Sequence, residues 1–152
     1  MAGLILHAPT GEISLTASTA KTCLTIKAPA NHRVKLLGLE VFFKGTSATD
    51  TPVKIEMSRI TTDGSGGVTT LTPAPNDENA GETPLSTVKS AYTTEPTTYG
   101  VNLKTWEVHP QTGLIVYFPL GQEVIIKGGN ILGLRLTSSQ AETVSIDPVF
   151  EE

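Results

Sequence analysis

The sequence predicts an all-β protein, an antiparallel two-sheet jelly-roll sandwich of about eight strands with one long loop excursion. Three observations predict this fold class. Apolar residues alternate with a period of two, the chain is rich in Thr, Val and Ile, and turn signals recur every roughly 8 to 12 residues in its C-terminal part. Connections of uneven length favour a jelly roll over an up-and-down barrel, whose connections are uniformly short.

The predicted strands begin with a short segment and a long one. The first strand covers residues 23–27 and ends at the turn 28–32. The second, residues 33–44, is apolar on both faces, which predicts a central strand, and a turn at 45–51 follows it. Strict alternation puts Leu37, Leu39, Val41 and Phe43 on one face and Val34, Leu36, Gly38 and Phe42 on the other.

The third predicted strand, residues 52–61, is amphipathic, so we expect it to have one wet face. After Thr62 the alternation stops, and residues up to about Tyr99 are predicted to form the long loop excursion, rich in Gly, Pro and Thr. Loops of this length inside a compact domain are usually functional or held by a partner.

Strand character then returns at residues 101–109, 114–119, 123–127, 131–138 and 142–150. With the three earlier segments, these give the count of about eight strands. We expect one domain, residues 20–152, preceded by an N-terminal arm of residues 1–19.

Composition excludes several function classes. The 152 residues are 38% hydrophobic and 17% charged, which is typical of a soluble globular domain. A net charge of -4 is unlike the basic surface that nucleic acid selects, so we expect no nucleic-acid partner. The N-terminal apolar run, residues 4–6, is too short for a membrane span or a signal peptide, so we expect synthesis in a cytoplasm and no membrane partner.

Residues that could carry catalysis are scattered. Cys23 is single and has no neighbouring His or second Cys, which predicts a buried structural thiol. His7, His32 and His109 form no metal-binding pattern such as H-x-H, so no metal site is predicted.

Two loop features are equally uninformative for catalysis. The run Gly64-Ser65-Gly66-Gly67 lacks the Gly-Lys-Ser/Thr ending of a phosphate loop. Asp77, Glu78 and Glu82 cluster in a polar loop where nothing would desolvate them, so we interpret them as a solvated surface. The sequence therefore predicts neither an enzyme nor a cofactor.

Trp106 and Arg135 each allow two interpretations. Trp106 shares a strand face with Val108 and could anchor the core or an interface, of which the core is favoured. Arg135 alternates away from the leucines beside it, so it either reaches water or pairs with a carboxylate across a subunit boundary.

Several segments together resemble the jelly-roll head decoration, or cement, proteins of tailed bacteriophages. They are Leu36-Leu37-Gly38-Leu39-Glu40-Val41 leading to Pro52-Val53-Lys54-Ile55, the excursion from Leu71-Thr72-Pro73 to Tyr92-Thr93-Thr94-Glu95-Pro96, Trp106-Glu107-Val108-His109-Pro110, and Gly128-Gly129-Asn130-Ile131-Leu132-Gly133-Leu134-Arg135-Leu136. The resemblance covers most of the chain from about residue 20, and it consists of strands and turns without a catalytic fingerprint.

The resemblance implies a structural role. Such proteins bind the outer surface of the expanded capsid, commonly as homotrimers, and hold neighbouring capsomers together against the pressure of the DNA. By resemblance, the partners would be the major capsid protein and further copies of this chain, and the location would be the outer surface of the virion head.

Contact surfaces can be assigned on this basis. We expect the N-terminal arm to contact the capsid through Leu4, Ile5 and Leu6. We expect the excursion and a nearby strand to contact a neighbouring copy through Val68, Leu71, Tyr92, Tyr99 and Arg135.

Two other function classes stay open. A trimeric receptor- or glycan-binding head of a phage fibre would share the fold, although it normally follows a fibrous shaft. An enzyme on a cupin-like barrel is the third class, and it would require a bound transition metal.

Overall fold

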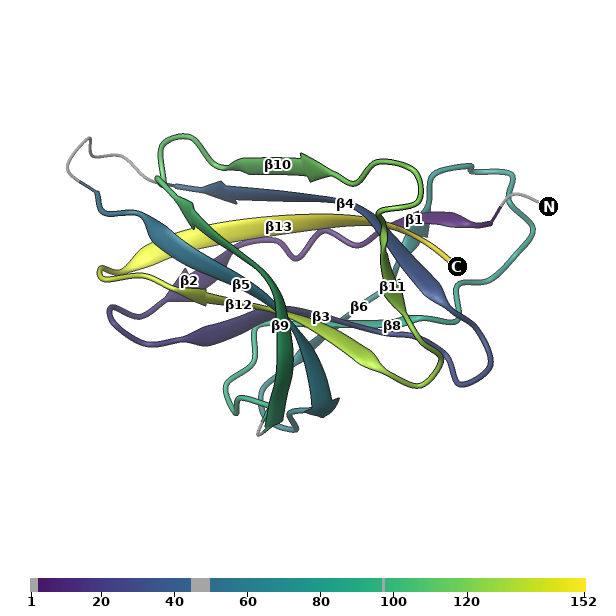
Figure 1. Ribbon diagram of the computed structural model, residues 1–152, viewed down its shortest axis with the longest axis horizontal. Helices are drawn as coiled ribbons and strands as arrows, with labels where there is room; N and C mark the ends of the chain where they lie inside the picture. The colour runs from purple at the N-terminus through teal and green to yellow at the C-terminus, as the bar shows by residue number, and fades with distance from the viewer. Residues whose placement is uncertain (1–2, 45–49, 97) are drawn as a thin grey trace.

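The computed structural model describes residues 3–44, 50–96 and 98–152 and consists of two antiparallel β-sheets (Figure 1). The described residues contain no helix, so the predicted all-β, two-sheet architecture is confirmed. The part of the chain that the structure describes has thirteen strands, whereas the sequence predicted about eight. The predicted turn at 45–51 lies mostly outside the described residues, as residues 45–49 are not described.

Sheet A has the strand order β10-β4-β13-β1-β7, with β11 also paired to β4 and β2 also paired to β13. Its strands are β1 (Ile5–His7), β2 (Ile13–Leu15), β4 (Val34–Phe43), β7 (Ala74–Pro75), β10 (Leu114–Tyr117), β11 (Val124–Ile126) and β13 (Glu142–Glu151). The long strands β4 and β13 form its centre.

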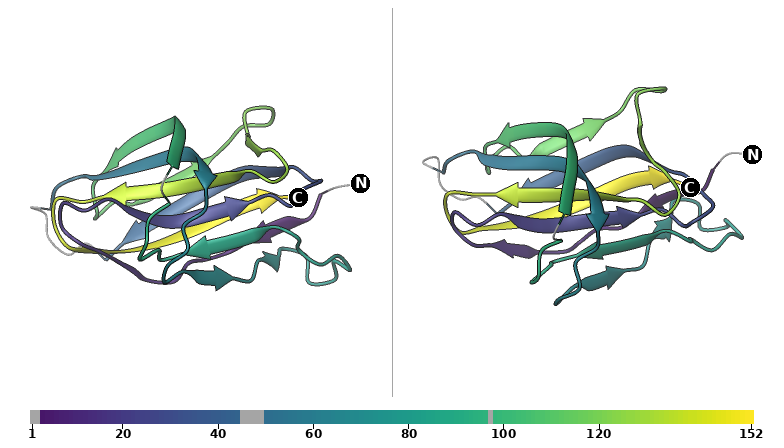
Figure 2. Two further views of the ribbon diagram at one scale, coloured as in Figure 1. Left: turned by 90° about the horizontal axis from the view of Figure 1, so that it is seen from below. Right: turned by 60° about the horizontal axis from the view of Figure 1, so that its bottom comes forward.

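Sheet B has the strand order β6-β8-β3-β12-β5-β9. Its strands are β3 (Lys21–Lys27), β5 (Val53–Thr62), β6 (Thr69–Leu71), β8 (Thr87–Ser90), β9 (Thr98–Val108) and β12 (Ile131–Thr137). Figure 2 shows the teal strands β6 and β8 beside β3, at the edge of the sheet away from β9.

The core lies between the sheets and is built from their inward-facing aliphatic side chains. Leu39 and Phe150 from sheet A and Ile26 and Leu136 from sheet B are among its fully buried members. Cys23 belongs to the same cluster, and Trp106 packs against it while partly buried, as the core reading of Trp106 expects.

The predicted alternation in β4 is wrong after Leu36. Leu36 and Leu39 are both buried, whereas Leu37 between them is only half-buried. The pairing with β13 shifts here by one residue, so that Leu37 is an extra residue opposite the β13 ladder, as in a β-bulge. A bulge reverses which residues face inward, and an alternation rule extrapolated across it fails.

The N-terminal segment is part of sheet A. β1 pairs with the end of β13 on one side and with β7 on the other, and β2 pairs with the start of β13. Leu6 is 0% exposed, and Ala8 and Ile13 are also buried in the core. The residues described from the predicted arm therefore contribute two short strands to the sandwich.

The excursion is not a structureless loop, because it contains β6, β7 and β8. β5 and β6 lie towards opposite edges of sheet B, as do β8 and β9, so the chain must cross the sheet twice. The crossing segments are residues 63–68 and 91–96, which we call the cover. They are joined by a bridge between Gly66 and Thr94.

Candidate functional site

Within the described ranges, the cysteine and the histidines considered in the sequence analysis do not come together at one site. Among the described residues, no group of three or more His, Cys, Asp or Glu side chains could hold a metal ion. His7 Nδ1 lies 3.6 Å from Asp147 Oδ2, while His109 Nδ1 accepts a hydrogen bond from the Gln111 amide (3.2 Å). His7 and His109 therefore make separate local contacts.

Cys23 is a buried thiol, as predicted. Burial raises its pKa to about 12, because the low-polarity surroundings disfavour the thiolate. At neutral pH the sulfur is therefore protonated and enclosed, which makes it a poor nucleophile and metal ligand.

Tyr99 and Arg135, predicted to contact a neighbouring copy, contact each other on the outer face of sheet B. The Arg135 guanidinium lies 4.2 Å from the centre of the Tyr99 ring, and its Nη2 lies 3.2 Å from Glu56 Oε2. The Tyr99 hydroxyl donates to Glu95 (2.9 Å), which also accepts the Thr22 amide (2.8 Å). Through Glu95, this cluster anchors the cover to β3 and β9.

A second cluster anchors the other end of the cover. The buried Tyr92 hydroxyl lies 2.7 Å from Thr25 Oγ1 and donates to Asp63 (2.8 Å), whose second oxygen pairs with Lys89 (2.6 Å). Burial and the neighbouring Asp63 carboxylate raise the pKa of Tyr92. Burial opposes ionisation of Asp63, but hydrogen bonds from Lys89 and Tyr92 outweigh it and hold its pKa below the ordinary value.

Gly64 lets the two crossing segments lie close together. A Cβ atom at this position would lie 2.7 Å from the Thr94 carbonyl oxygen and 2.8 Å from the Tyr92 ring. Glycine is therefore required for the cover to pack in this way. The Gly-rich run is thus a packing element of the cover.

The remaining predicted contact residues differ in accessibility. Leu6 and Tyr92 are buried within the chain, so neither lies on the surface. Leu4 and Leu71 pack partly against the core, and Val68 is half-buried. Ile5 is 40% exposed.

The outer face of sheet A carries exposed apolar side chains that the sequence analysis did not single out. Phe42 is 43%, Ile115 59% and Tyr117 57% exposed. Ile115 pairs with Glu40 and Tyr117 with Gly38, and the missing side chain at Gly38 makes room for the Tyr117 ring. We call Phe42, Ile115 and Tyr117 the strip.

Two carboxylates lie in the middle of this face. Glu40 and Asp147 are directly opposite each other on β4 and β13, and directly opposite residues share a face. The Tyr117 hydroxyl donates to Glu40 (2.7 Å), and the nearby carboxylates raise the pKa of Tyr117. We call Glu40 and Asp147 the acid pair.

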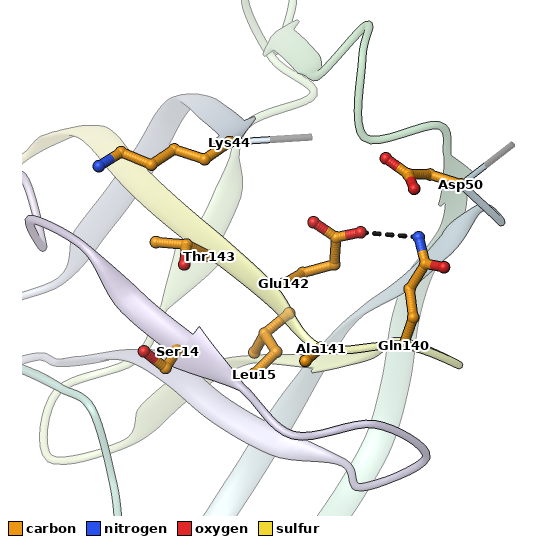
Figure 3. A pocket seen from close by; sticks show the side chains of 8 residues that line it. All are labelled: Ser14, Leu15, Lys44, Asp50, Gln140, Ala141, Glu142 and Thr143. Atoms are coloured by element: carbon orange, nitrogen blue, oxygen red, sulfur yellow. Dashed lines mark hydrogen bonds between the residues drawn. The ribbon is translucent and has the colours of Figure 1, made fainter. Parts of the chain in front are cut away.

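A polar hollow of about 410 Å³ is lined by residues of β2, of the start of β13 and of the segments that follow β4 and β12 (Figure 3). Gln140 Nε2 donates to Glu142 (2.8 Å), and Lys44 pairs with Glu12. Asp50 forms a further part of the wall. The described residues that line the hollow include no aromatic side chain, so it offers hydrogen-bonding groups without the stacking surface that sugars prefer.

Comparison with known proteins gives no relative. The chain matches no protein-family model, no curated protein and no solved structure. In the part of the chain that the structure describes, no helix is long and apolar enough to cross a membrane.

Proposed function

We propose that this protein is a jelly-roll decoration protein of a bacteriophage head, a non-enzymatic component that binds the outer capsid surface and stabilises the expanded shell. The observation that carries the proposal is the nested pairing of the strands. The pairs, from the ends of the chain inward, are β1 with β13, β3 with β12, β4 with β10 and β11, and β5 with β9.

This nesting supports the jelly-roll assignment. A jelly roll is a long antiparallel hairpin rolled into two sheets, so its early strands pair with its late strands in reverse order. Here the excursion with β6, β7 and β8 is inserted at the tip of that hairpin, between β5 and β9. Without the inserted strands, and with β1 and β2, and β10 and β11, each counted as one interrupted strand, eight strands are left.

The surfaces suit a protein that works through many weak contacts. Copies arranged on a symmetric shell act together, so each contact can be modest while the assembled layer resists rupture. Self-association into homotrimers would involve the strip on sheet A, since exposed apolar patches mark interaction sites. The shell contact would use the exposed part of the N-terminal segment around Ile5, and Leu6 serves the core.

Immunogold labelling tests the location. Particles from a host that carries the gene are labelled with antibody against the purified chain, and particles from a deletion strain serve as the control. We expect gold over the head surface, and we expect deletion particles to release their DNA at a lower temperature. Particles without label would overturn the proposal.

A trimeric receptor- or glycan-binding fibre head is the second candidate. The polar hollow with Gln140 and Glu142 is the observation that favours it, because such groups can hydrogen-bond a sugar. The same labelling separates the two candidates, since a fibre head would place the gold at the tail tips.

A further inference from the structure

The outer face of sheet A has an unbalanced charge within an apolar surface. The acid pair places two carboxylates opposite each other, which destabilises a sheet unless a cation is near. Among the described residues, no lysine or arginine forms an ion pair with Glu40 or Asp147. Among the described residues, Asp147 has only His7 at 3.6 Å and Glu40 has only the Tyr117 hydroxyl, so neither carboxylate of the acid pair has a permanent cation beside it.

The free edge of sheet B has the complementary character. β9 is the outermost strand of its sheet, and Val101 (69% exposed) and Leu103 (37% exposed) lie on it. Lys104 is exposed beside them and lies over the Phe118 ring (5.7 Å to its centre). Neither Lys104 nor Arg59 on the adjacent β5 forms an ion pair within the described chain. The part of this edge from Val101 to Lys104 is therefore apolar and basic, although Glu107 is exposed further along β9. The part of the sheet A face around the strip and the acid pair is apolar and acidic.

We propose that the β9 edge of one copy docks on the outer face of sheet A of the next copy, with Lys104 facing Glu40 and Asp147. Val101 and Leu103 would pack on the strip and exclude water around the charges, which strengthens their attraction. The two surfaces are different parts of one molecule, so the contact is head-to-tail and forms a ring if its rotation closes. Three chains of 16.1 kDa give a ring of about 48 kDa.

This inference takes up the self-association contained in the proposed function, and its test is independent of any capsid. The purified wild-type chain is compared with Lys104→Glu, Glu40→Lys and the double variant, by light scattering coupled to size exclusion at matched concentrations. We expect the wild-type chain to be a trimer and each single reversal to be a monomer at the same concentration. We expect the double variant to recover the trimer, because it again places opposite charges at positions 104 and 40.

Two further variants separate the contact from folding and from net charge. Lys127→Glu makes the same charge change at an exposed lysine on another part of the surface and should leave the trimer intact. Ile115→Asp removes an exposed strip residue with little effect on the fold and should give a monomer. Far-ultraviolet circular dichroism checks that each variant is folded.

Three results would overturn the proposed contact: a monomeric wild-type chain, a trimer unaffected by the single reversals, or a double variant that stays monomeric. None of them would decide the capsid role. If the gold label lies on heads while the wild-type chain is monomeric, the proposed function stands and the proposed contact fails. If the charge variants verify the contact and no particle is labelled, the proposed contact stands and the proposed function fails.

Discussion

The outer faces of the two sheets differ in whether another segment of the chain covers them. Sheet B is crossed by the cover, and buried Tyr92 together with Glu95 attaches that segment to threonines of β3. On sheet A, none of the described segments covers the strip, and Phe42, Ile115 and Tyr117 are exposed. The outer face of sheet B is therefore covered by a segment of the same chain. The outer face of sheet A leaves apolar side chains and the acid pair in contact with solvent.

This difference shows where the chain can interact. The polar groups under the cover already have partners within the subunit, so they stabilise the fold and offer few free donors or acceptors. The strip instead leaves apolar side chains of Phe42, Ile115 and Tyr117 exposed, and an exposed apolar surface is open to another molecule. We therefore expect substitutions under the cover to change stability, and substitutions on the strip to change association.

The largest effect is expected in the core that both faces share. Leu6→Ala should lower the free energy of unfolding by about 2–5 kcal/mol, because it leaves a cavity at a fully buried site. Its neighbour Ile5 is the matched control on the same strand, and Ile5→Ala should cost about 1 kcal/mol or less. Urea denaturation of both variants measures this.

Equal losses in these two variants would contradict the placement of β1 in the sheet. If β1 is part of the sheet, deletion of residues 1–12 should lower the free energy of unfolding more than either substitution does, since it also removes the pairing of β1 with β13.

The next largest effect is expected from replacing a tyrosine by phenylalanine on the covered face of sheet B, compared with the same replacement on the exposed face of sheet A. Tyr92→Phe should cost about 1–3 kcal/mol, because it leaves the buried Thr25 hydroxyl without its partner. Tyr117→Phe removes a hydrogen bond to Glu40 at an exposed site, where water can replace it, and should cost about 0.5 kcal/mol or less. Thermal unfolding of the two variants in parallel gives both values, and a larger loss for Tyr117→Phe would reverse the comparison.

The fold class could be predicted from the sequence because it depends on long, alternating segments. β5, β12 and β13 each contain enough positions to show a period of two. β6 and β7 have only three and two residues, which are too few to show any period, so the excursion was predicted as a loop. The bulge at Leu37 could not be predicted either, because the alternation within β4 does not show how its residues pair with those of β13.

The candidate site was predictable only in part. Tyr92, Tyr99 and Arg135 were predicted to contact a neighbouring copy, and the contacts that the structure shows for them lie within the chain. The hydrogen-bond partners of Tyr99, Thr22 and Glu95, are 73 residues apart, and no local pattern joins them. The acid pair likewise depends on the pairing of Glu40 with Asp147, which only the fold brings together.

A smaller effect on stability is expected when the pH is lowered, and it should come from Asp63 on the covered face of sheet B. The pKa of Asp63 is lower in the folded chain than its ordinary value of 3.8, so its carboxylate stabilises the fold above that pH. This contribution is lost as the pH falls below 3.8 and through the lower folded pKa. Asp63→Asn should therefore weaken the dependence of stability on pH in this range, measured by thermal unfolding at a series of acid pH values. Glu78→Gln, at an exposed loop carboxylate, should leave that dependence unchanged.

The smallest effect is expected at Cys23, whose thiol lies beneath sheet B in the core. Its pKa of about 12 and its burial leave almost no accessible thiolate at neutral pH, so a disulfide reagent should not modify it in the folded chain. In denaturant the same thiol should react completely, which provides the internal control. Under native conditions, modification can proceed only through opening of the fold, so Tyr92→Phe should accelerate it and Tyr117→Phe should not. Rapid labelling of the native wild-type chain would show that sheet B opens readily, and the contrast between a closed face and an open one would then no longer hold.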